Sequence, residues 1–356
     1  MPTPCIVIDG LVTRRNLDRM AAYVKSHNLK LRPHTKTHKS IRIARMQADR
    51  GAVGLTVAKV GEALLMSQAH DDILMAYPPV HPMRCAVLTK LAASKTIRVG
   101  IDSREAADSL AEAAQSAGST IGILVDLDVG HHRTGVQSPT AALELAQYAA
   151  KVKGLRLDGM MFFPGHLSHG SSDAAMHGID AIIKETLALW KRSGLAAPIV
   201  SGGSTPTADE SHHLTSLTEI RPGTYVFNDM NSVYANCATF ADCAATILAT
   251  VVSTAVPGQI VLDAGSKTLT SDRCGPKPES GHGFIREYPS AKIAKLSEEH
   301  AQVDVTACDR VPRVGDRVNV IPNHICPCVN LQDSVWWQEP GEDPVELPVD
   351  ARGKVF

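Results

Sequence analysis

The sequence predicts a (β/α)8 barrel of the TIM type followed by a smaller β domain, and two observations carry this prediction. From Leu29 to about Gly223, short aliphatic or β-branched runs alternate with alanine-rich amphipathic segments, as in repeated βα units around a parallel sheet. After about Val233 the runs are strand-like and are broken by Gly, Pro and Asp. The chain has 356 residues, more than one core usually supports. We therefore expect one domain at 10–233 and a second at 234–356, joined by an N-terminal strand at 1–9.

Eight candidate strands lie in the first region, at 29–33, 53–57, 72–77, 97–101, 120–128, 155–163, 198–202 and 217–221. The segments between them are typical of helices, because Ser138 and Pro139 form a good N-cap and first-turn pair before one helical run. Ser103 precedes another such run. Eight βα units favour a closed barrel, in which chemistry lies where strands end and loops begin. A doubly wound open sheet is the structural alternative.

The second region contains five candidate strands, at 244–252, 259–262, 301–305, 317–321 and 335–338. The run at 5–8 precedes the first barrel strand and could pair with this β domain. No internal repeats interrupt either region.

Composition and charge restrict the possible partners. The formal net charge is −1 without a basic run, so the chain lacks the electrostatic signature of a nucleic-acid-binding or membrane-surface protein. No segment approaches the ~20 apolar residues that span a bilayer, and the N-terminus lacks a basic segment followed by an apolar one. The eight cysteines are scattered, which favours free thiols in a reducing compartment. We expect a cytoplasmic protein that acts on a small molecule.

The first candidate strand ends in a cationic run that contains His34, Lys36, His38 and Lys39. Neighbouring cations and partial loss of water both disfavour an ammonium group, and a neutral lysine amine can form an imine with a carbonyl. Lys36 is therefore a candidate Schiff-base lysine. A solvated basic turn, or a single phosphate-binding loop, is the alternative from this segment alone.

Two glycine-bearing turns follow the seventh and eighth candidate strands. The first is the hydroxyl-rich segment 200–207 and the second is the segment 219–225. Glycines allow close approach of the backbone, and successive amides can surround a phosphate. Phosphate sites after strands seven and eight recur in this architecture. Turns without a ligand are the alternative for each segment.

A third segment, in the β domain, contains His324 and Cys326. In an extended segment these side chains point to the same side, so that an imidazole and a thiolate could bind one metal such as zinc. Two ligands are too few for a structural zinc site and leave positions open for water or substrate, as in a catalytic site. A packed histidine beside a buried thiol is the alternative.

Taken together, these segments resemble the D-threonine aldolase and D-serine dehydratase family, the metal-dependent branch of the alanine-racemase-like (fold-type III) enzymes that use pyridoxal 5′-phosphate (PLP). The matching segments follow in order along nearly the whole chain, at 3–16, 32–39, 56–63, 126–136, 201–207, 221–227, 262–267, 299–300 and 322–326. Each motif is modest evidence, whereas their number and order make the resemblance specific.

The resemblance implies a role for each of these segments. Lys36 would form the Schiff base with PLP, and Arg133 would lie near the cofactor ring. The remaining cofactor-binding residues would be His34, Phe163, Ser201, Gly202, Gly203, Ser204, Thr205, Gly223, Thr224 and Tyr225. His324 and Cys326 would bind a divalent ion, Zn²⁺, Mn²⁺ or Mg²⁺. PLP then serves as an electron sink, and the ion polarises the β-hydroxyl of the substrate.

The family contains two lyase reactions on D-β-hydroxy-α-amino acids, and the sequence has features of both. Retro-aldol cleavage gives glycine and an aldehyde, whereas dehydration of the D-serine or D-3-hydroxyaspartate type gives a 2-oxo acid. The family's dehydratases usually carry His-x-Cys, as at Cys326, but the segment after Pro327 is similar to that of the aldolases. Phe163 stands where the aldolases carry a tyrosine, and His166 could supply an acid-base group nearby. We expect an aldolase, with the dehydratase as the alternative.

Three other functions remain open from the sequence. A racemase would need a second base opposite Lys36 and no metal. A non-catalytic PLP carrier would explain Lys36 and the phosphate turns but not His324 and Cys326. A metal hydrolase would use His34 and His38 as ligands. By analogy with the fold, we also expect a homodimer.

Overall fold

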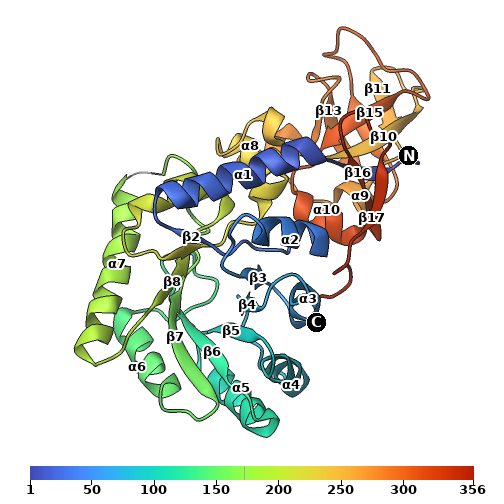
Figure 1. Cartoon of the computed structure of the whole chain (residues 1–356). Helices are drawn as coiled ribbons and strands as arrows, with labels where there is room; N and C mark the ends of the chain where they lie inside the picture. The colour runs from blue at the N-terminus through green and yellow to red at the C-terminus, as the bar shows by residue number, and fades with distance from the viewer. Residues whose placement is uncertain (172) are drawn as a thin grey trace. The chain divides into compact units, whose positions relative to one another are not determined.

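The computed structural model describes residues 1–171 and 173–356, which form two compact units (Figure 1). We name them by their sheets. The barrel unit comprises Met20–Lys36, Ser40–Gly223 and Lys354–Phe356. The sheet unit comprises Met1–Arg19, Thr37–Lys39 and Thr224–Gly353. The boundary at Arg19 falls inside helix α1 (Gly10–Ser26).

The barrel unit contains eight parallel strands in the order β2-β9-β8-β7-β6-β5-β4-β3. Their bounds are β2 (Lys30–Leu31), β3 (Leu55–Val57), β4 (Asp72–Met75), β5 (Thr96–Ile101), β6 (Ile121–Asp126), β7 (Leu155–Met161), β8 (Ile199–Gly202) and β9 (Glu219–Ile220). The outer strands β2 and β3 also meet, because the Val53 amide donates to the Leu31 carbonyl and His34 bridges Thr56 in parallel. The prediction of a (β/α)8 barrel is confirmed, and all eight candidate strands are present.

Burial explains why these segments are strands flanked by helices. All six residues of β6 are buried, as expected of a parallel strand that is covered on both faces. The helices between successive strands are α2 (Ile41–Ala48), α3 (Val60–Met66), α4 (Pro82–Leu91), α5 (Arg104–Ala117), α6 (Pro139–Ala149) and α7 (Asp173–Arg192). In Figure 1, α4 to α7 lie outside the strands β5 to β8. Ser103 and Ser138 accept from the amides of Ala106 and Ala141, so both predicted N-caps are confirmed.

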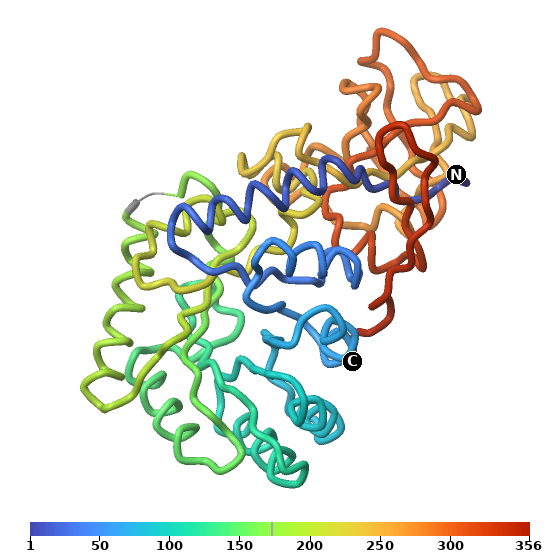
Figure 2. Tube along the Cα trace, in the orientation of Figure 1, coloured from blue at the N-terminus to red at the C-terminus, as the bar shows by residue number. Residues whose placement is uncertain are grey.

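The sheet unit contains a nine-stranded sheet with the order β13-β14-β11-β10-β1-β16-β17, in which β15 also pairs with β10 and β12. Its strands are β1 (Cys5–Asp9), β10 (Ala245–Ser253), β11 (Gln259–Leu262), β12 (Phe284–Ile285), β13 (Lys292–Leu296), β14 (Ala301–Asp304), β15 (Arg317–Ile321), β16 (Ser334–Gln338) and β17 (Val345–Pro348). Strand β1 pairs with β10 and β16, which confirms the expected pairing of the N-terminal run. Figure 2 shows this blue segment beside the orange and red trace. Three strands, β12, β13 and β17, were not predicted.

Short helices connect the strands of the sheet unit, namely α8 (Met230–Tyr234), α9 (Ser266–Leu269) and α10 (Ile325–Leu331). The eight cysteines are free thiols, as expected. Among the residues that the structure describes, no helix has the length and apolar character needed to cross a bilayer.

Candidate functional site

Lys36 lies in the turn that follows β2, at the carboxyl end of the barrel strands. Two neighbouring strands fix this turn. The amide of His34 donates to the carbonyl of Pro222, and the amide of Thr35 donates to the carbonyl of Thr56 at 2.9 Å. The Thr35 hydroxyl also donates to that carbonyl. The backbone around Lys36 is therefore held between the ends of β9 and β3.

The side chain of Lys36 is exposed, whereas Thr35 and Thr37 on either side of it are buried. Within the part of the chain that the structure describes, no carboxylate forms an ion pair with the Lys36 amine. Its backbone amide is 3.4 Å from Nδ1 of His34. A fixed backbone with an unpaired amine suits a lysine that condenses with an aldehyde.

The segments after β6 and β7 place an aromatic ring among cations at the same end of the barrel. The guanidinium carbon of Arg133 lies 4.5 Å from the centre of the Phe163 ring, and His131 meets that ring edge-on at 5.2 Å. Burial and the positive charges of Arg133 and His166 lower the pKa of His131. His166 is exposed. The predicted residues Arg133, Phe163 and His166 therefore belong to one cluster.

The two predicted phosphate turns meet through a hydrogen bond, since the Gly223 amide donates to the Thr205 hydroxyl at 3.2 Å. Gly203 has φ +83°, a left-handed conformation that favours glycine. Ser204 precedes the 3₁₀ helix Thr205–His213, and its hydroxyl lies 3.1 Å from that of Thr207. Amides at such a turn can donate to phosphate oxygens. Together with the Lys36 amine, this turn fits the aldehyde and phosphate groups of PLP.

Not every residue of these turns presents its side chain to a ligand. The Ser201 hydroxyl donates to Glu219 at 2.7 Å and accepts from Arg221 at 2.6 Å, all of them buried inside the barrel. Gly202 packs against Phe162, whose ring a Cβ at this position would meet at 2.2 Å. Ser201 and Gly202 therefore support the turn from within, while Thr224 and Tyr225 belong to the sheet unit.

His324 and Cys326 do not lie in an extended segment, so that part of the prediction is wrong. His324 is the extended N-cap residue of α10, and Cys326 lies in the first turn of that helix. Helix formation is explained by Asp229, whose carboxylate accepts from the amide of Ile325 at 3.1 Å. The two side chains still meet, because a hydrogen bond with Cys326 is one cause of the pKa shift of His324.

Carboxylates surround the imidazole of His324. Its Nδ1 lies 3.1 Å from Oδ2 of Asp272. Burial by itself would lower the pKa of His324, but the hydrogen bonds with Cys326 and Asp272 and the negative charges of Cys326 and Asp229 raise that pKa to about 9. The surroundings therefore favour positive charge at this position, whether it resides on the ring or on a bound cation.

Hydroxyl groups surround the Cys326 sulfur. The Thr37 hydroxyl lies 3.1 Å from Sγ and the Thr224 hydroxyl lies 3.6 Å from it. Hydroxyls can donate to a thiolate, which is the form that binds metal. Among the described residues, no cluster of three or more His, Cys, Asp or Glu side chains could hold a metal ion. His324 and Cys326 thus fit a two-ligand site with positions left for water or substrate.

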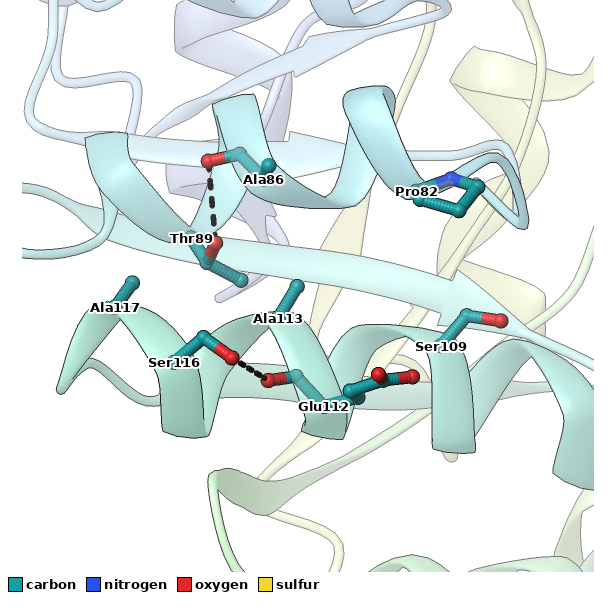
Figure 3. Close-up of a pocket in the computed structure, with 8 residues that line it drawn as sticks. All are labelled: Pro82, Ala86, Thr89, Ser109, Glu112, Ala113, Ser116 and Ala117. Atoms are coloured by element: carbon teal, nitrogen blue, oxygen red, sulfur yellow. Dashed lines mark hydrogen bonds between the residues drawn. The ribbon is translucent and has the colours of Figure 1, made fainter.

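A separate groove of about 380 Å³ lies between α4 and α5 in the barrel unit (Figure 3). Its lining consists mainly of small side chains, which are Pro82, Ala86, Thr89, Ser109, Glu112, Ala113, Ser116 and Ala117. Glu112 is the one ionisable group in this lining, so the groove offers neither an acid-base pair nor a set of several metal ligands. It contains none of the predicted site residues.

Asp272, Asp229, Thr37 and Thr224 surround His324 and Cys326, yet none of them was predicted to contact these two residues. Thr37 adjoins Lys36 in the cationic run, and Thr224 was assigned to the cofactor instead. Asp272 is 52 positions away from His324 in a segment without a recognisable motif. Only the position of Asp229 ahead of a short helical run gave a local signal.

Two family models match this sequence. Residues 8–231 match the alanine racemase N-terminal domain, and residues 244–337 match a putative serine dehydratase domain. The D-threonine aldolase of Arthrobacter sp. is 31% identical over 94% of this chain and 88% of its own length.

Two solved structures have the same fold over nearly the whole chain. The D-threonine aldolase from Filomicrobium marinum has a TM-score of 0.92 at 30% identity and covers 100% of this chain and 97% of its own. A variant of the D-threo-3-hydroxyaspartate dehydratase in its metal-free form has a TM-score of 0.87 at 26% identity and covers 98% of this chain and 97% of its own.

Proposed function

Because the chain belongs to the alanine-racemase-like family of PLP-dependent lyases, we propose that it cleaves D-β-hydroxy-α-amino acids to glycine and an aldehyde with the help of a divalent ion. D-threonine is the first substrate to test, since the Arthrobacter relative is named for it. The observation that carries the proposal is the Lys36 amine, which is exposed on a fixed backbone without a carboxylate partner among the described residues.

The proposal assigns one group of residues to each cofactor. Lys36 would bind the aldehyde carbon of PLP, and the turn at Gly203, Ser204 and Thr205, together with Gly223, would donate to its phosphate. Arg133, Phe163 and His34 would border the ring. His324 and Cys326 would bind the ion, Zn²⁺, Mn²⁺ or Mg²⁺. When bound, PLP withdraws electrons from the substrate's α-carbon and the ion polarises its β-hydroxyl.

Proton transfer falls to the chain's own residues. Retro-aldol cleavage requires a base for the β-hydroxyl proton before the Cα–Cβ bond breaks, and an acid that returns a proton to the α-carbon. His166 is the candidate for the hydroxyl proton, because its exposed imidazole belongs to the same cluster as His131 and Arg133 at the carboxyl end of the barrel. Phe163 has no hydroxyl and would contribute packing alone.

The dehydratase remains the second candidate, and Cys326 is the observation that favours it. His-x-Cys is the pattern that the resemblance associates with dehydration, and the putative serine dehydratase model matches the segment that contains it. In that reaction the α-proton leaves and hydroxide departs from the β-carbon, so that a 2-oxo acid and ammonia result.

We also propose the domain division of the sequence prediction, with a PLP-binding barrel at 10–233 and a metal-bearing β domain at 234–356. A cytoplasmic homodimer that takes a small D-amino acid, and binds neither nucleic acid nor membrane, is the corresponding expectation. Size-exclusion chromatography with light scattering tests the dimer.

The deciding experiment incubates the PLP-loaded enzyme with D-threonine or D-serine, with and without Mn²⁺ or Zn²⁺. Glycine, acetaldehyde and 2-oxo acid are assayed separately. An aldolase yields equal amounts of glycine and acetaldehyde from D-threonine and loses this activity with a chelator. Formation of 2-oxo acid without glycine would identify a dehydratase. Activity that persists unchanged after chelation, with interconversion of D- and L-amino acids, would identify a racemase and refute both lyase assignments.

A further inference from the structure

Asp272 forms a hydrogen bond with the imidazole of His324 that has a definite direction. Oδ2 of Asp272 lies 3.1 Å from Nδ1 of His324. A carboxylate can only accept, so Nδ1 must carry the proton. Nε2 is then the ring nitrogen that remains for Cys326 or for an ion.

The backbone of His324 is fixed on both sides, which leaves the ring rotation as its main freedom. The carbonyl of Asn323 accepts from the amide of Asn231 at 3.2 Å, and the amide of Ile325 donates to Asp229 at 3.1 Å. A histidine with a fixed backbone can still rotate about its side-chain bonds. The hydrogen bond with Asp272 favours one orientation of the ring.

The neighbour of His324 holds Asp272 in place. Asn323 is buried, and its side-chain amide donates to the carbonyl of Asp272 at 3.0 Å and to that of Gly281 at 2.8 Å. Consecutive residues of one segment therefore bind the backbone and the carboxylate of the same aspartate. These two hydrogen bonds fix both the backbone and the side chain of Asp272 relative to His324.

The residues that precede Asp272 also hold its backbone in place. The amide of Asp272 donates to the hydroxyl of Thr270 at 3.3 Å. Thr270 has φ +63° and ψ 172°, a backbone conformation that a β-branched residue rarely adopts. Strained residues of this kind persist where the surrounding structure determines them, and they concentrate at functional sites.

Asp229, the other carboxylate near His324, has a different task. It is buried, and its oxygens accept from the amides of Ile325 and Ser232 and from the Ser232 hydroxyl. These bonds fix helix ends and contribute charge. The ring hydrogen bond is made by Asp272.

We infer that Asp272 is the positioning residue of the metal centre, which holds His324 with Nδ1 protonated and presents Nε2 to the divalent ion beside Cys326. The inference rests on the proposed function, since it takes His324 and Cys326 as the ligands. Carboxylates that accept from the second nitrogen of a metal-bound histidine orient the ring and raise its basicity. Loss of such a partner should weaken metal binding without removing a ligand.

The test measures metal affinity directly in the PLP-loaded enzyme. The Kd for Zn²⁺ and Mn²⁺ is obtained by competition with a chelator in the wild type, Asp272→Ala, Asp272→Asn and His324→Ala. Asp343→Asn is the matched control, because Asp343 is an exposed aspartate of the same unit. We expect Asp272→Ala to bind the ion roughly 10- to 100-fold more weakly. Asp272→Asn should fall between it and the wild type, because the amide oxygen still accepts.

A second measurement separates positioning from general damage to the fold. Activity is titrated with Mn²⁺ in each variant, and the PLP absorbance reports whether the barrel is intact. We expect the midpoint for Mn²⁺ to rise in both Asp272 variants, while the activity at saturating metal stays near that of the wild type and the PLP absorbance is unchanged. A structural defect would lower the saturated activity instead, which would overturn the inference.

The outcomes also distinguish this inference from the proposed function. Unchanged affinity in Asp272→Ala, with binding lost in His324→Ala, overturns the positioning role and leaves the metal centre intact. Wild-type affinity in His324→Ala, or no metal binding by the wild type, overturns the metal-dependent function itself.

Discussion

The two ends of the barrel use the same residue types in opposite ways. At the amino end of the strands, every arginine is paired: Arg32 binds Glu219 and Asp72, and Arg98 binds Asp72 and Asp158. These residues line a charged cavity of about 390 Å³. At the carboxyl end, neither Lys36 nor Arg133 forms an ion pair with a carboxylate of the described residues.

The difference arises because the loops at the carboxyl end neutralise their own carboxylates. Asp128 accepts from the amides of Gly130, His131 and His132, each at 3.0 Å. The carboxylate of Asp102 accepts from the amide of Gly135. Backbone amides and the neighbouring His132 side chain thus serve as the partners of these carboxylates, and Lys36 and Arg133 form no ion pair with them. Ion pairs at the amino end stabilise the barrel, whereas these two cations at the carboxyl end, which have no carboxylate partner among the described residues, are available to a ligand.

The largest expected effect comes from replacing Lys36, in the turn that follows β2, and the comparison is with Lys30 at the start of the same strand. Lys36→Ala should abolish activity and the absorbance of bound PLP, because the variant lacks the amine that would form the Schiff base. Lys30→Ala, at the start of β2, is the control and should keep both properties. An active, colourless Lys36→Ala would refute the role of this lysine.

Substitutions among the ion pairs at the amino end should lower the stability of the fold and leave the chemistry unaffected. Glu219→Ala leaves the buried guanidinium of Arg32 without its 2.8 Å partner, and breaking such a pair costs about 3–5 kcal/mol. Arg156→Ala removes a half-exposed partner of Asp158 and should cost at most about 1 kcal/mol. Urea unfolding measures both values. Equal costs would mean that burial does not distinguish these pairs.

The carboxyl end has a carboxylate whose contribution depends on pH. Burial raises the pKa of Asp128, but the amides of His132 and Gly130 and the His132 side chain outweigh it and lower the pKa to about 2. A group whose pKa is lower in the folded state stabilises the fold above its unfolded pKa, and that stability is lost as the pH falls from about 4 towards 2. Asp128→Asn should therefore cost roughly 2 kcal/mol at pH 7.

Unfolding of wild type and Asp128→Asn at several pH values checks this expectation. The difference in unfolding free energy should shrink steadily below about pH 4. A difference that is independent of pH would show that the amide hydrogen bonds, and not the charge, carry the contribution of Asp128.

At the carboxyl end of the barrel, the smallest expected effect concerns the turn at Gly203. With φ +83°, alanine should cost about 1–2 kcal/mol of stability, although a Cβ would meet its nearest neighbour at an ordinary 3.4 Å. The PLP affinity should fall as well, if this turn holds the phosphate. Gly178→Ala is the control, because this exposed glycine lies in α7 with nothing within 4 Å, and alanine favours a helix. Unchanged PLP affinity in Gly203→Ala would contradict the phosphate role.

The sequence predicted the barrel well because its strands are buried on both faces and separated by clear helical runs. Three strands of the other sheet were missed for the opposite reason. Strand β13 buries only Ile293, β17 buries no residue fully, and β12 has two residues. Such edge strands lack an apolar pattern and exist because a neighbouring strand pairs with them. Local sequence contains no signal for that pairing.

The residues of the site also divide into those that the local sequence predicts and those that depend on tertiary contacts. Lys36 and the glycine turns could be predicted, because each motif lies at the end of a recognisable strand. The helical position of Cys326 could not, since it depends on Asp229, which lies 96 positions from the capped Ile325. The contact between Asp272 and His324 depends likewise on tertiary structure. Motifs therefore indicated which residues do the chemistry, while the groups that orient them required the fold.

The position of β1 in its sheet affects folding during synthesis on the ribosome. Val7 pairs with Thr246 on one side and Trp336 on the other, so 329 residues separate it from its later partner. At a synthesis rate of about 5–20 residues per second, the ribosome needs roughly 16–66 s to bridge that interval. The barrel segments up to Gly223 leave the ribosome in the meantime. The edge of β1 that pairs with β16 therefore stays without its partner until Trp336 has been translated, well after β10 is available to the other edge.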